Sequence, residues 1–279
     1  MSTPVDQGGT VTAAALREWP LPQPDGAKDS RGRVLVVGGS ASTPGAAMLA
    51  GLAVLRVGAG VLGLAVDEPV APAVAAALPE ASVTTLADLG PALDGCRAVL
   101  VGPGFDNPDP ARAALEQVLA GVSDEALLVI DAFALGVLAD VDGAGSLTGR
   151  AVLTPNRSEA ARLLDTDRLD DDAGAVAAAI ADRFQAVVTF QSDVAAPDGR
   201  RWTVPSGHPG LGTSGSGDVL AGAVAGLLAR GADREQAACW ATYLHATAGD
   251  RLAARIGRLG FLARELTAEL PLVLVETEA

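Results

Sequence analysis

The chain alternates between short, continuous apolar runs and segments whose apolar residues recur at helical spacing. Six such runs end in Gly, polar residues or a turn, and they cover 33–37, 61–66, 98–104, 127–132, 151–156 and 186–190. Strands that are apolar along their whole length are buried on both faces, which is typical of a parallel sheet covered by helices. We therefore predict an α/β fold with a mainly parallel central sheet and helices on both faces.

The composition indicates how the core of this fold is built. Hydrophobic residues make up 49% of the chain but aromatic residues only 3%, so Ala, Val and Leu must form thin, closely packed layers. No Pro-, Gly- or Ser-rich linker divides the 279 residues. We predict one domain over 31–279, preceded by a leader segment over 1–30 that packs over an edge of the sheet.

The charge and the apolar stretches exclude several classes of partner. A net charge of −14 repels polyanions, so we expect no nucleic acid and no membrane surface as a partner. The longest apolar stretch, Val219–Ala229, is too short to span a bilayer. Cys96 and Cys239 are too few for a disulfide framework or a zinc site. Since no secretory signal pattern begins the chain, we predict a cytoplasmic protein.

Lysine is nearly absent, which restricts how the chain can bind phosphate. Lys28 is the single lysine, so a Walker-type phosphate loop is excluded and Schiff-base chemistry is disfavoured. A small phosphate ligand stays compatible with the acidic chain, because backbone dipoles outweigh a screened surface field over a few ångströms.

A glycine-rich loop leads directly into a helical pattern at residue 218. Gly212, Gly215 and Gly217 allow the backbone to approach a ligand closely, and Ser216 lies between the last two. The first turn of a helix presents unpaired N–H groups to an anion. A carboxylate there, Asp218, is placed to take a proton from a hydroxyl that attacks a bound phosphoryl group. The alternative is that Asp218 only complements the helix dipole.

Polar residues also follow the predicted strands, where ligands bind in open parallel sheets. Asp131 is placed either to cap the next helix or to face the phosphates. Asn156 and Glu159 have the spacing of a helix capping box, which is compatible with ligand contact by Asn156. Gln191 and Ser192 line the predicted nucleotide site by position alone.

The two histidines have no Cys or His neighbour at metal-ligand spacing, so we assign no metal ligand in the sequence. His208 lies in the Gly- and Pro-containing loop, where a substrate contact and a surface turn are equally plausible. His245 follows a helical pattern, which favours a hydrogen-bonded role in helix packing.

Five motifs in order resemble one family, the ADP-dependent NAD(P)H-hydrate dehydratases of the ribokinase-like superfamily. They are "RGRVLVVGGSASTPGAAMLAGLAVLRVGAG" (31–60), "VGPG" (101–104), "LTPNRSEAARLL" (153–164), "GHPGLGTSGSGDVLAG" (207–222) and "YLHATAGD" (243–250). The resemblance covers roughly residues 28–270, and an ordered set is far more specific than any one motif.

The resemblance implies a ribokinase-like fold and a lyase that repairs hydrated NADH and NADPH. ADP would phosphorylate the hydroxyl of the hydrate, and elimination of phosphate would leave AMP and NAD(P)H. By position, Ala46, Gly104 and Asn156 would contact the hydrated dinucleotide, Gly217 the adenine nucleotide, and Asp218 would be the base. Magnesium is expected on the phosphates. The resemblance also implies a homotetramer and a functional partnership with an NAD(P)H-hydrate epimerase.

Two departures from the family pattern keep alternatives open. "TPNRSE" replaces the usual T-P-H-P-G-E, and "TFQSDV" replaces a Lys- and Gly-rich nucleotide loop. The first change resembles sugar and vitamin kinases of the same superfamily, which would accumulate a phosphorylated product. The second motivates a nucleotide-binding protein without catalysis, which ADP would stabilise without turnover.

Overall fold

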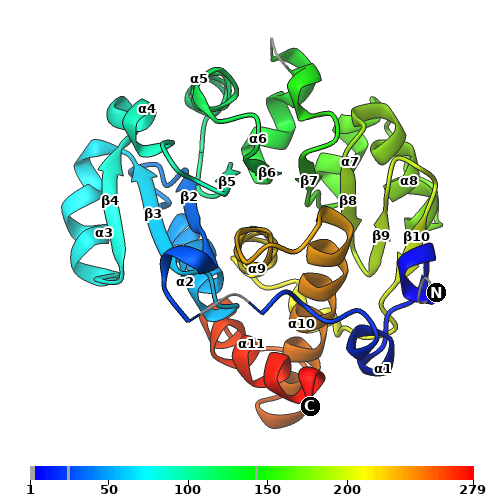
Figure 1. Cartoon of the computed structure of the whole chain (residues 1–279). Helices are drawn as coiled ribbons and strands as arrows, with labels where there is room; N and C mark the ends of the chain where they lie inside the picture. Colours follow the sequence, from blue (N-terminus) through cyan, green and yellow to red (C-terminus); the bar gives the residue numbers. More distant parts are fainter. Residues whose placement is uncertain (1–3, 24–25, 142–143) are drawn as a thin grey trace.

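A ten-stranded sheet forms the centre of the molecule (Figure 1). The computed structural model describes residues 4–23, 26–141 and 144–279. Within these ranges the strand order is β1-β10-β9-β8-β7-β6-β5-β2-β3-β4. The strands are β1 (Gly9–Thr10), β2 (Arg33–Val37), β3 (Val61–Val66), β4 (Ala81–Thr85), β5 (Ala98–Val101), β6 (Leu127–Ile130), β7 (Ala151–Leu153), β8 (Val187–Phe190), β9 (Asp193–Ala195) and β10 (Arg201–Thr203).

The predicted mainly parallel sheet is confirmed. All pairings from β8 through β7, β6, β5, β2 and β3 to β4 are parallel, and only the pairings of β9 with β8 and β10 are antiparallel. The predicted runs 33–37 and 61–66 coincide with β2 and β3. The runs that begin at residues 98, 127 and 151 each consist of a strand, β5, β6 or β7, followed by residues that leave the strand and turn, as predicted.

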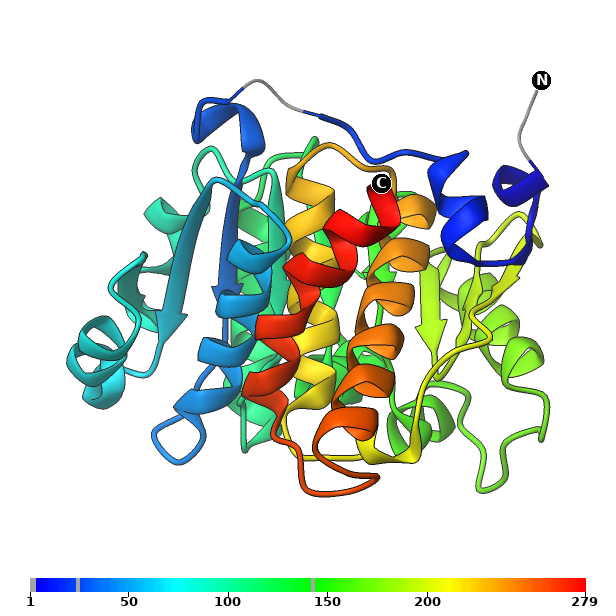
Figure 2. The same cartoon turned by 90° about the horizontal axis from the view of Figure 1, so that it is seen from below.

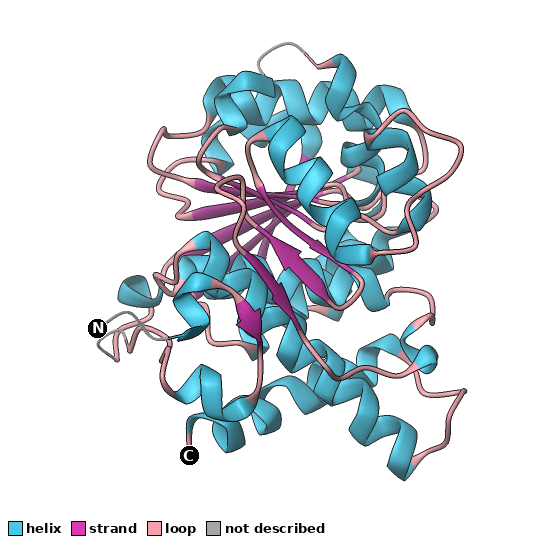
Figure 3. Cartoon of the chain, turned by 90° about the vertical axis from the view of Figure 1, so that its right-hand side faces the viewer, coloured by secondary structure: helices cyan, strands magenta, loops and turns pink. Residues whose placement is uncertain are grey.

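Helices cover both faces of the sheet, as predicted (Figures 2 and 3). Figure 2 shows α2, α9, α10 and α11 side by side over one face, and Figure 1 places α5, α6, α7 and α8 on the other. The helices are α1 (Ala13–Arg17), α2 (Pro44–Arg56), α3 (Ala71–Ala77), α4 (Leu89–Ala92), α5 (Pro108–Gly121), α6 (Ala132–Val137), α7 (Arg157–Leu163), α8 (Ala173–Phe184), α9 (Ser216–Ala229), α10 (Arg234–Arg255) and α11 (Ala263–Glu278). None of the helices described is long and apolar enough to cross a membrane.

The strands β2, β3, β5, β6, β7, β8 and β9 each contribute to two apolar clusters, one on either face. In β2, Val34 and Val36 belong to the cluster under α2, α9 and α10, whereas Leu35 and Val37 belong to the cluster under α5 and α8. Successive side chains of a strand point to opposite faces, so the apolar run fills both clusters. This explains why the strands lack a polar alternation.

The small residues of α9 allow it to lie directly against α2. A Cβ added at Gly222 would lie 2.1 Å from the carbonyl oxygen of Ala50, and one at Gly226 would lie 2.7 Å from that of Val54. Both glycines have helical backbone conformation, so glycine is required because a side chain would clash with α2, and not because of an unusual φ. The close approach fixes the position of the first turn of α9, which is where the sequence places Asp218.

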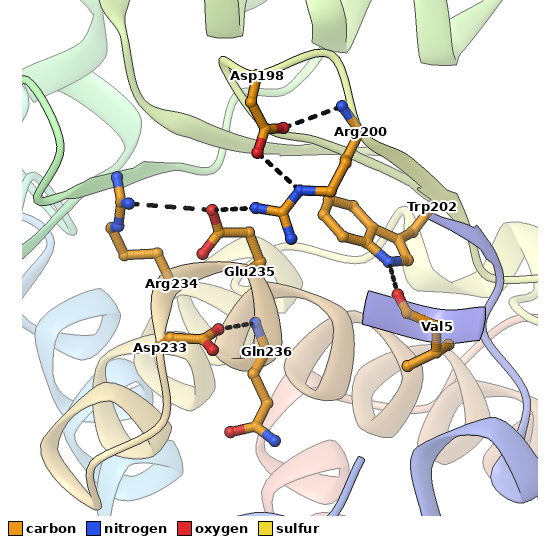
Figure 4. A network of polar contacts seen from close by, with 8 residues as sticks. All are labelled: Val5, Asp198, Arg200, Trp202, Asp233, Arg234, Glu235 and Gln236. Atoms are coloured by element: carbon orange, nitrogen blue, oxygen red, sulfur yellow. Dashed lines mark hydrogen bonds and ion pairs between the residues drawn. The ribbon is translucent and has the colours of Figure 1, made fainter. Parts of the chain in front are cut away.

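The leader packs on the β10 edge of the sheet and on α10. Trp19 stacks on Trp202 with the ring centroids 6.3 Å apart, and its carbonyl accepts the indole N–H of Trp240. The indole of Trp202 donates to the carbonyl of Val5 (Figure 4). Leu16 is fully buried in the cluster under α10. The division of the chain at residue 30 stays a prediction.

Figure 4 also shows how the β9–β10 turn is attached to the start of α10. The guanidinium of Arg200 contacts Asp198 at 2.7 Å and Glu235 at 3.1 Å, and lies 5.3 Å from the ring centre of Trp202. Asp233 caps α10 by accepting the amide of Gln236. These contacts hold the antiparallel edge, whose strands were too short and mixed in polarity to be predicted from the sequence.

Candidate active site

The strand order reverses direction between β2 and β5, and two glycine-containing turns meet there. The amide of Ser40 donates to the carbonyl of Gly104 at 2.7 Å, and that of Gly39 donates to Pro103 at 2.8 Å. Gly104 has φ 76°, and a Cβ there would lie 2.4 Å from the carbonyl oxygen of Thr43. Crevices at such reversals bind ligands in α/β folds. Ala46, in the first turn of α2, is half-buried and follows the first of these turns along the chain.

A hollow opens beside the first turn of α9, and we call it the α9 cleft. Its volume is about 630 Å³, within the usual range for a small-molecule site. Its lining combines polar residues with a few apolar ones: Thr154, Pro155, Asn156, Arg157, Thr189, Gln191, Ser192, Ser206, Gly207, His208, Pro209, Leu211, Gly212, Ser216, Gly217, Leu220, Thr242, His245 and Ala246. The structure thus brings together five of the predicted contact residues, Asn156, Gln191, Ser192, Ser216 and Gly217.

The first turn of α9 presents unpaired amides at this cleft. Gly215 is the N-cap with φ 86°, and a Cβ there would lie 2.6 Å from Leu49, so glycine is required. Among the described residues, no hydrogen bond is made by the amides of Gly217 and Asp218. A Cβ at Gly217 would have no heavy atom within 4 Å, so the backbone faces open space. This arrangement binds anions.

Asp218 lies half-buried in the same turn, next to a second carboxylate. Burial, and then the negative charge of Glu159, raise the pKa of Asp218 to about 6. A carboxylate of that pKa is ionised at neutral pH yet is a stronger base than an exposed aspartate. The geometry therefore supports a proton acceptor beside an anion site.

Asp131 is fully buried at the end of β6 and makes no helix-capping hydrogen bond. Its Oδ1 accepts the hydroxyl of Thr154 at 2.6 Å. Burial, followed by the charge of Asp218, raises the pKa of Asp131 to about 8, although the Thr154 hydroxyl opposes this. Asp131 thus occupies the N-cap position of α6 without a side-chain capping bond, and its carboxyl is protonated at neutral pH beneath the site.

The capping box predicted from "TPNRSE" is present. Asn156 Oδ1 accepts the amide of Glu159 at 3.0 Å, and Glu159 Oε2 accepts the amide of Asn156 at 2.8 Å. Asn156 also lines the α9 cleft, so its capping role is compatible with the predicted ligand contact, which stays a prediction. Gln191 has φ 56°, a left-handed conformation that turns the chain from β8 towards β9 and leaves the side chain in the cleft lining.

Both histidines line the α9 cleft, although the sequence did not favour a binding-site role for either of them. His208 Nδ1 accepts the amide of Gly210 and begins a short turn. His245 is buried on α10 and bonds to Ser216. Sequence reasoning missed Arg157 and Thr242 as lining residues, because nothing in their local pattern distinguishes a cleft wall from an ordinary helix surface.

Comparison with known proteins identifies the relatives of this chain. A family model described as NAD(P)H-hydrate dehydratase matches residues 34–272. An ADP-dependent (S)-NAD(P)H-hydrate dehydratase of Xanthomonas campestris pv. campestris is 46% identical, over 95% of this chain and 96% of the relative. A bifunctional NAD(P)H-hydrate repair enzyme of Moorella thermoacetica is 38% identical over 96% of this chain, which spans 54% of that protein.

Solved structures agree with the family resemblance seen in the motifs. The ADP/ATP-dependent NAD(P)H-hydrate dehydratase from Bacillus subtilis, co-crystallised with ATP and Mg²⁺, superposes with a TM-score of 0.81 at 29% identity, over 96% of this chain and 98% of that one. A ribokinase-like superfamily protein from Enterococcus faecalis has a TM-score of 0.84 at 24% identity over the whole of both chains and shows the fold alone. The chain therefore has the ribokinase-like fold and belongs to the NAD(P)H-hydrate dehydratase family.

Proposed function

We propose that this protein is a lyase that uses ADP to dehydrate hydrated NADH and NADPH. One observation carries the proposal: the first turn of α9 holds the unpaired amides of Gly217 and Asp218, Gly217 lines an open cleft, and the half-buried carboxylate of Asp218 has a pKa of about 6. This combination of anion site and base suits transfer of a phosphoryl group to a hydroxyl.

The reaction divides between the α9 cleft and the turns that follow β2 and β5. The adenine nucleotide occupies the α9 cleft, contacted by Gly215, Ser216 and Gly217, with Gln191 and Ser192 along the wall. Its terminal phosphate lies at the first turn of α9, where amide donors stabilise the charge that develops during transfer.

The hydrated dinucleotide occupies the crevice between β2 and β5, against Ala46 and Gly104, and reaches Asn156. Asp218 accepts the proton of the hydrate hydroxyl as its oxygen bonds to phosphorus and the bond to AMP breaks. Departure of the phosphate, together with loss of a proton from the neighbouring ring carbon to solvent, then forms the ring double bond and leaves the reduced dinucleotide.

Magnesium fits this site as an ion carried by the nucleotide phosphates. Within the described ranges no three His, Cys, Asp or Glu side chains are grouped so as to hold a metal. Mg²⁺ commonly takes only one or two carboxylates together with phosphate oxygens, and Asp218 and Glu159 are the acidic groups beside the anion site. When bound, the ion supplies neutralisation of the phosphate charge.

The proposal also covers the location and the assembly of the protein. Both buried cysteines are free thiols, which agrees with a location in the cytoplasm, where thiols stay reduced. We propose a homotetramer and a partnership with an NAD(P)H-hydrate epimerase, which would supply the epimer that this site accepts.

A repair assay tests the proposed function. The protein is incubated with hydrated NADH or hydrated NADPH and with ADP or ATP, and recovery of nicotinamide absorbance is followed together with release of nucleoside product and phosphate. Recovery with ADP is expected. A phosphorylated product that accumulates without recovery would favour the kinase alternative, for which the N-x-x-E spacing of Asn156 and Glu159 speaks. Binding of ADP without either product would favour the non-catalytic alternative.

A further inference from the structure

The side chains of His245 and Ser216 form a buried pair at the back wall of the α9 cleft. His245 comes from the middle of α10 and Ser216 is the first residue of α9. The Nε2 atom of His245 lies 2.9 Å from Ser216 Oγ and 3.0 Å from the carbonyl oxygen of Ser216. The exposed fractions of the two residues are 9% and 3%, so water does not compete for these bonds.

The carbonyl contact fixes the direction of both hydrogen bonds. A carbonyl oxygen only accepts, so Nε2 must carry the hydrogen that it donates. Burial lowers the pKa of His245 to about 4, although the bond to Ser216 opposes this, and the ring is therefore neutral. With its hydrogen on Nε2, the imidazole also donates to Ser216 Oγ, which is left as an acceptor in that contact.

The hydroxyl hydrogen of Ser216 is consequently available to a ligand. Across the described part of the chain, no acceptor for it is found, and Ser216 lines the cleft next to the unpaired amide of Gly217. We propose that His245 is a positioning residue that holds the Ser216 hydroxyl as a donor to a phosphate of the adenine nucleotide.

A second hydroxyl pair in the same cleft shows the opposite arrangement. Thr242 Oγ1 donates to the carbonyl of Ala238 at 2.7 Å, so Thr189 Oγ1 must donate to Thr242 Oγ1 at 2.8 Å. Both hydrogens are used inside the protein, and neither hydroxyl can donate to a ligand. A matched control should remove a buried hydroxyl outside the cleft, and Thr277 on α11 offers one, because its Oγ1 donates to the carbonyl of Val273 at 2.7 Å.

The inference rests on the proposed binding of ADP in the α9 cleft, and calorimetry with ADP and adenosine tests it. Ser216→Ala is expected to weaken ADP binding about tenfold to a hundredfold, the range for a hydrogen bond to a charged group, and to leave adenosine binding unchanged. Thr277→Val is expected to change ADP binding less than about twofold. His245→Gln, whose amide can donate as Nε2 does, is expected to keep ADP binding within a few-fold of wild type.

A double-mutant cycle separates positioning from helix packing. His245→Leu is expected to weaken ADP binding about as much as Ser216→Ala does, but to add less than about twofold when Ser216 is already Ala. Equal losses in both backgrounds would overturn the inference, because His245 would then act through the packing of α10 alone. Unchanged binding in Ser216→Ala would overturn it as well. If the wild type binds adenosine but not ADP, the proposed function fails together with the inference, whereas only the inference fails when wild type and Ser216→Ala bind ADP equally.

Discussion

Replacing Asp218 by Asn should abolish most of the activity and at the same time stabilise the fold. The ordinary pKa of this carboxyl is 3.8 and its pKa in the fold is about 6. Each pKa unit corresponds to about 1.4 kcal/mol, so the ionised carboxylate costs up to about 3 kcal/mol of folding free energy at neutral pH. Asn has nearly the same shape and carries no charge. The functional turn of α9 is thus expected to be a place where stability is sacrificed for catalysis.

The pH dependence gives the sharpest form of this prediction. Because the folded-state pKa is raised, ionisation of Asp218 lowers stability as the pH rises from about 4 to about 6, and the cost is constant above that window. The Asn side chain does not titrate there. The difference in unfolding free energy between Asp218→Asn and wild type should therefore be near zero at pH 4 and increase between pH 4 and pH 6. At higher pH it should stay constant, at up to about 3 kcal/mol.

Urea denaturation across this pH range measures the difference, and Asp182→Asn, which removes an exposed carboxylate of α8, is the control. The repair assay is run in parallel, where loss of a general base should lower kcat by about 10² to 10⁴. A variant that is inactive but no more stable than wild type at pH 7 would refute the buried-carboxylate reasoning. A variant that is more stable but fully active would remove Asp218 as the base.

Further predictions concern the glycines of α9 and the charge at the cleft. Gly217→Val should leave the denaturation midpoint nearly unchanged, because an added Cβ meets nothing within 4 Å. Calorimetry should nevertheless show at least about tenfold weaker ADP binding, because the new side chain enters the cleft. Unchanged affinity for ADP would contradict this placement of the nucleotide. Gly222→Ala should lose about 1–3 kcal/mol of stability in urea denaturation through overpacking against α2, and an unchanged midpoint would contradict the close contact. Arg157 is the one Lys or Arg among the described residues of the cleft lining, so Arg157→Gln should raise the KM for ADP several-fold. Arg183 is exposed and lies outside the cleft, so Arg183→Gln should leave this KM unchanged.

The sequence by itself determined the elements whose cause is local. The apolar runs of β2 and β3 were predicted with their observed bounds, because a strand buried on both faces needs apolar residues along its whole length. The loop before α9 and the carboxylate in its first turn were also evident, since helix starts and glycine-rich turns follow from short-range backbone chemistry. The capping box of Asn156 and Glu159 belongs to the same class.

Only the tertiary structure decided which distant residues meet. The order of strands placed β2 beside β5, so that the turns after these two strands meet. It also put β9 and β10 next to the edge strand β1, which their short sequences of mixed polarity did not predict. Burial beside other carboxyl groups raised the pKa of Asp131 and Asp218, and packing of α10 against α9 joined His245 to Ser216. Desolvation and long-range contacts depend on residues far apart along the chain, so a local sequence pattern cannot predict them.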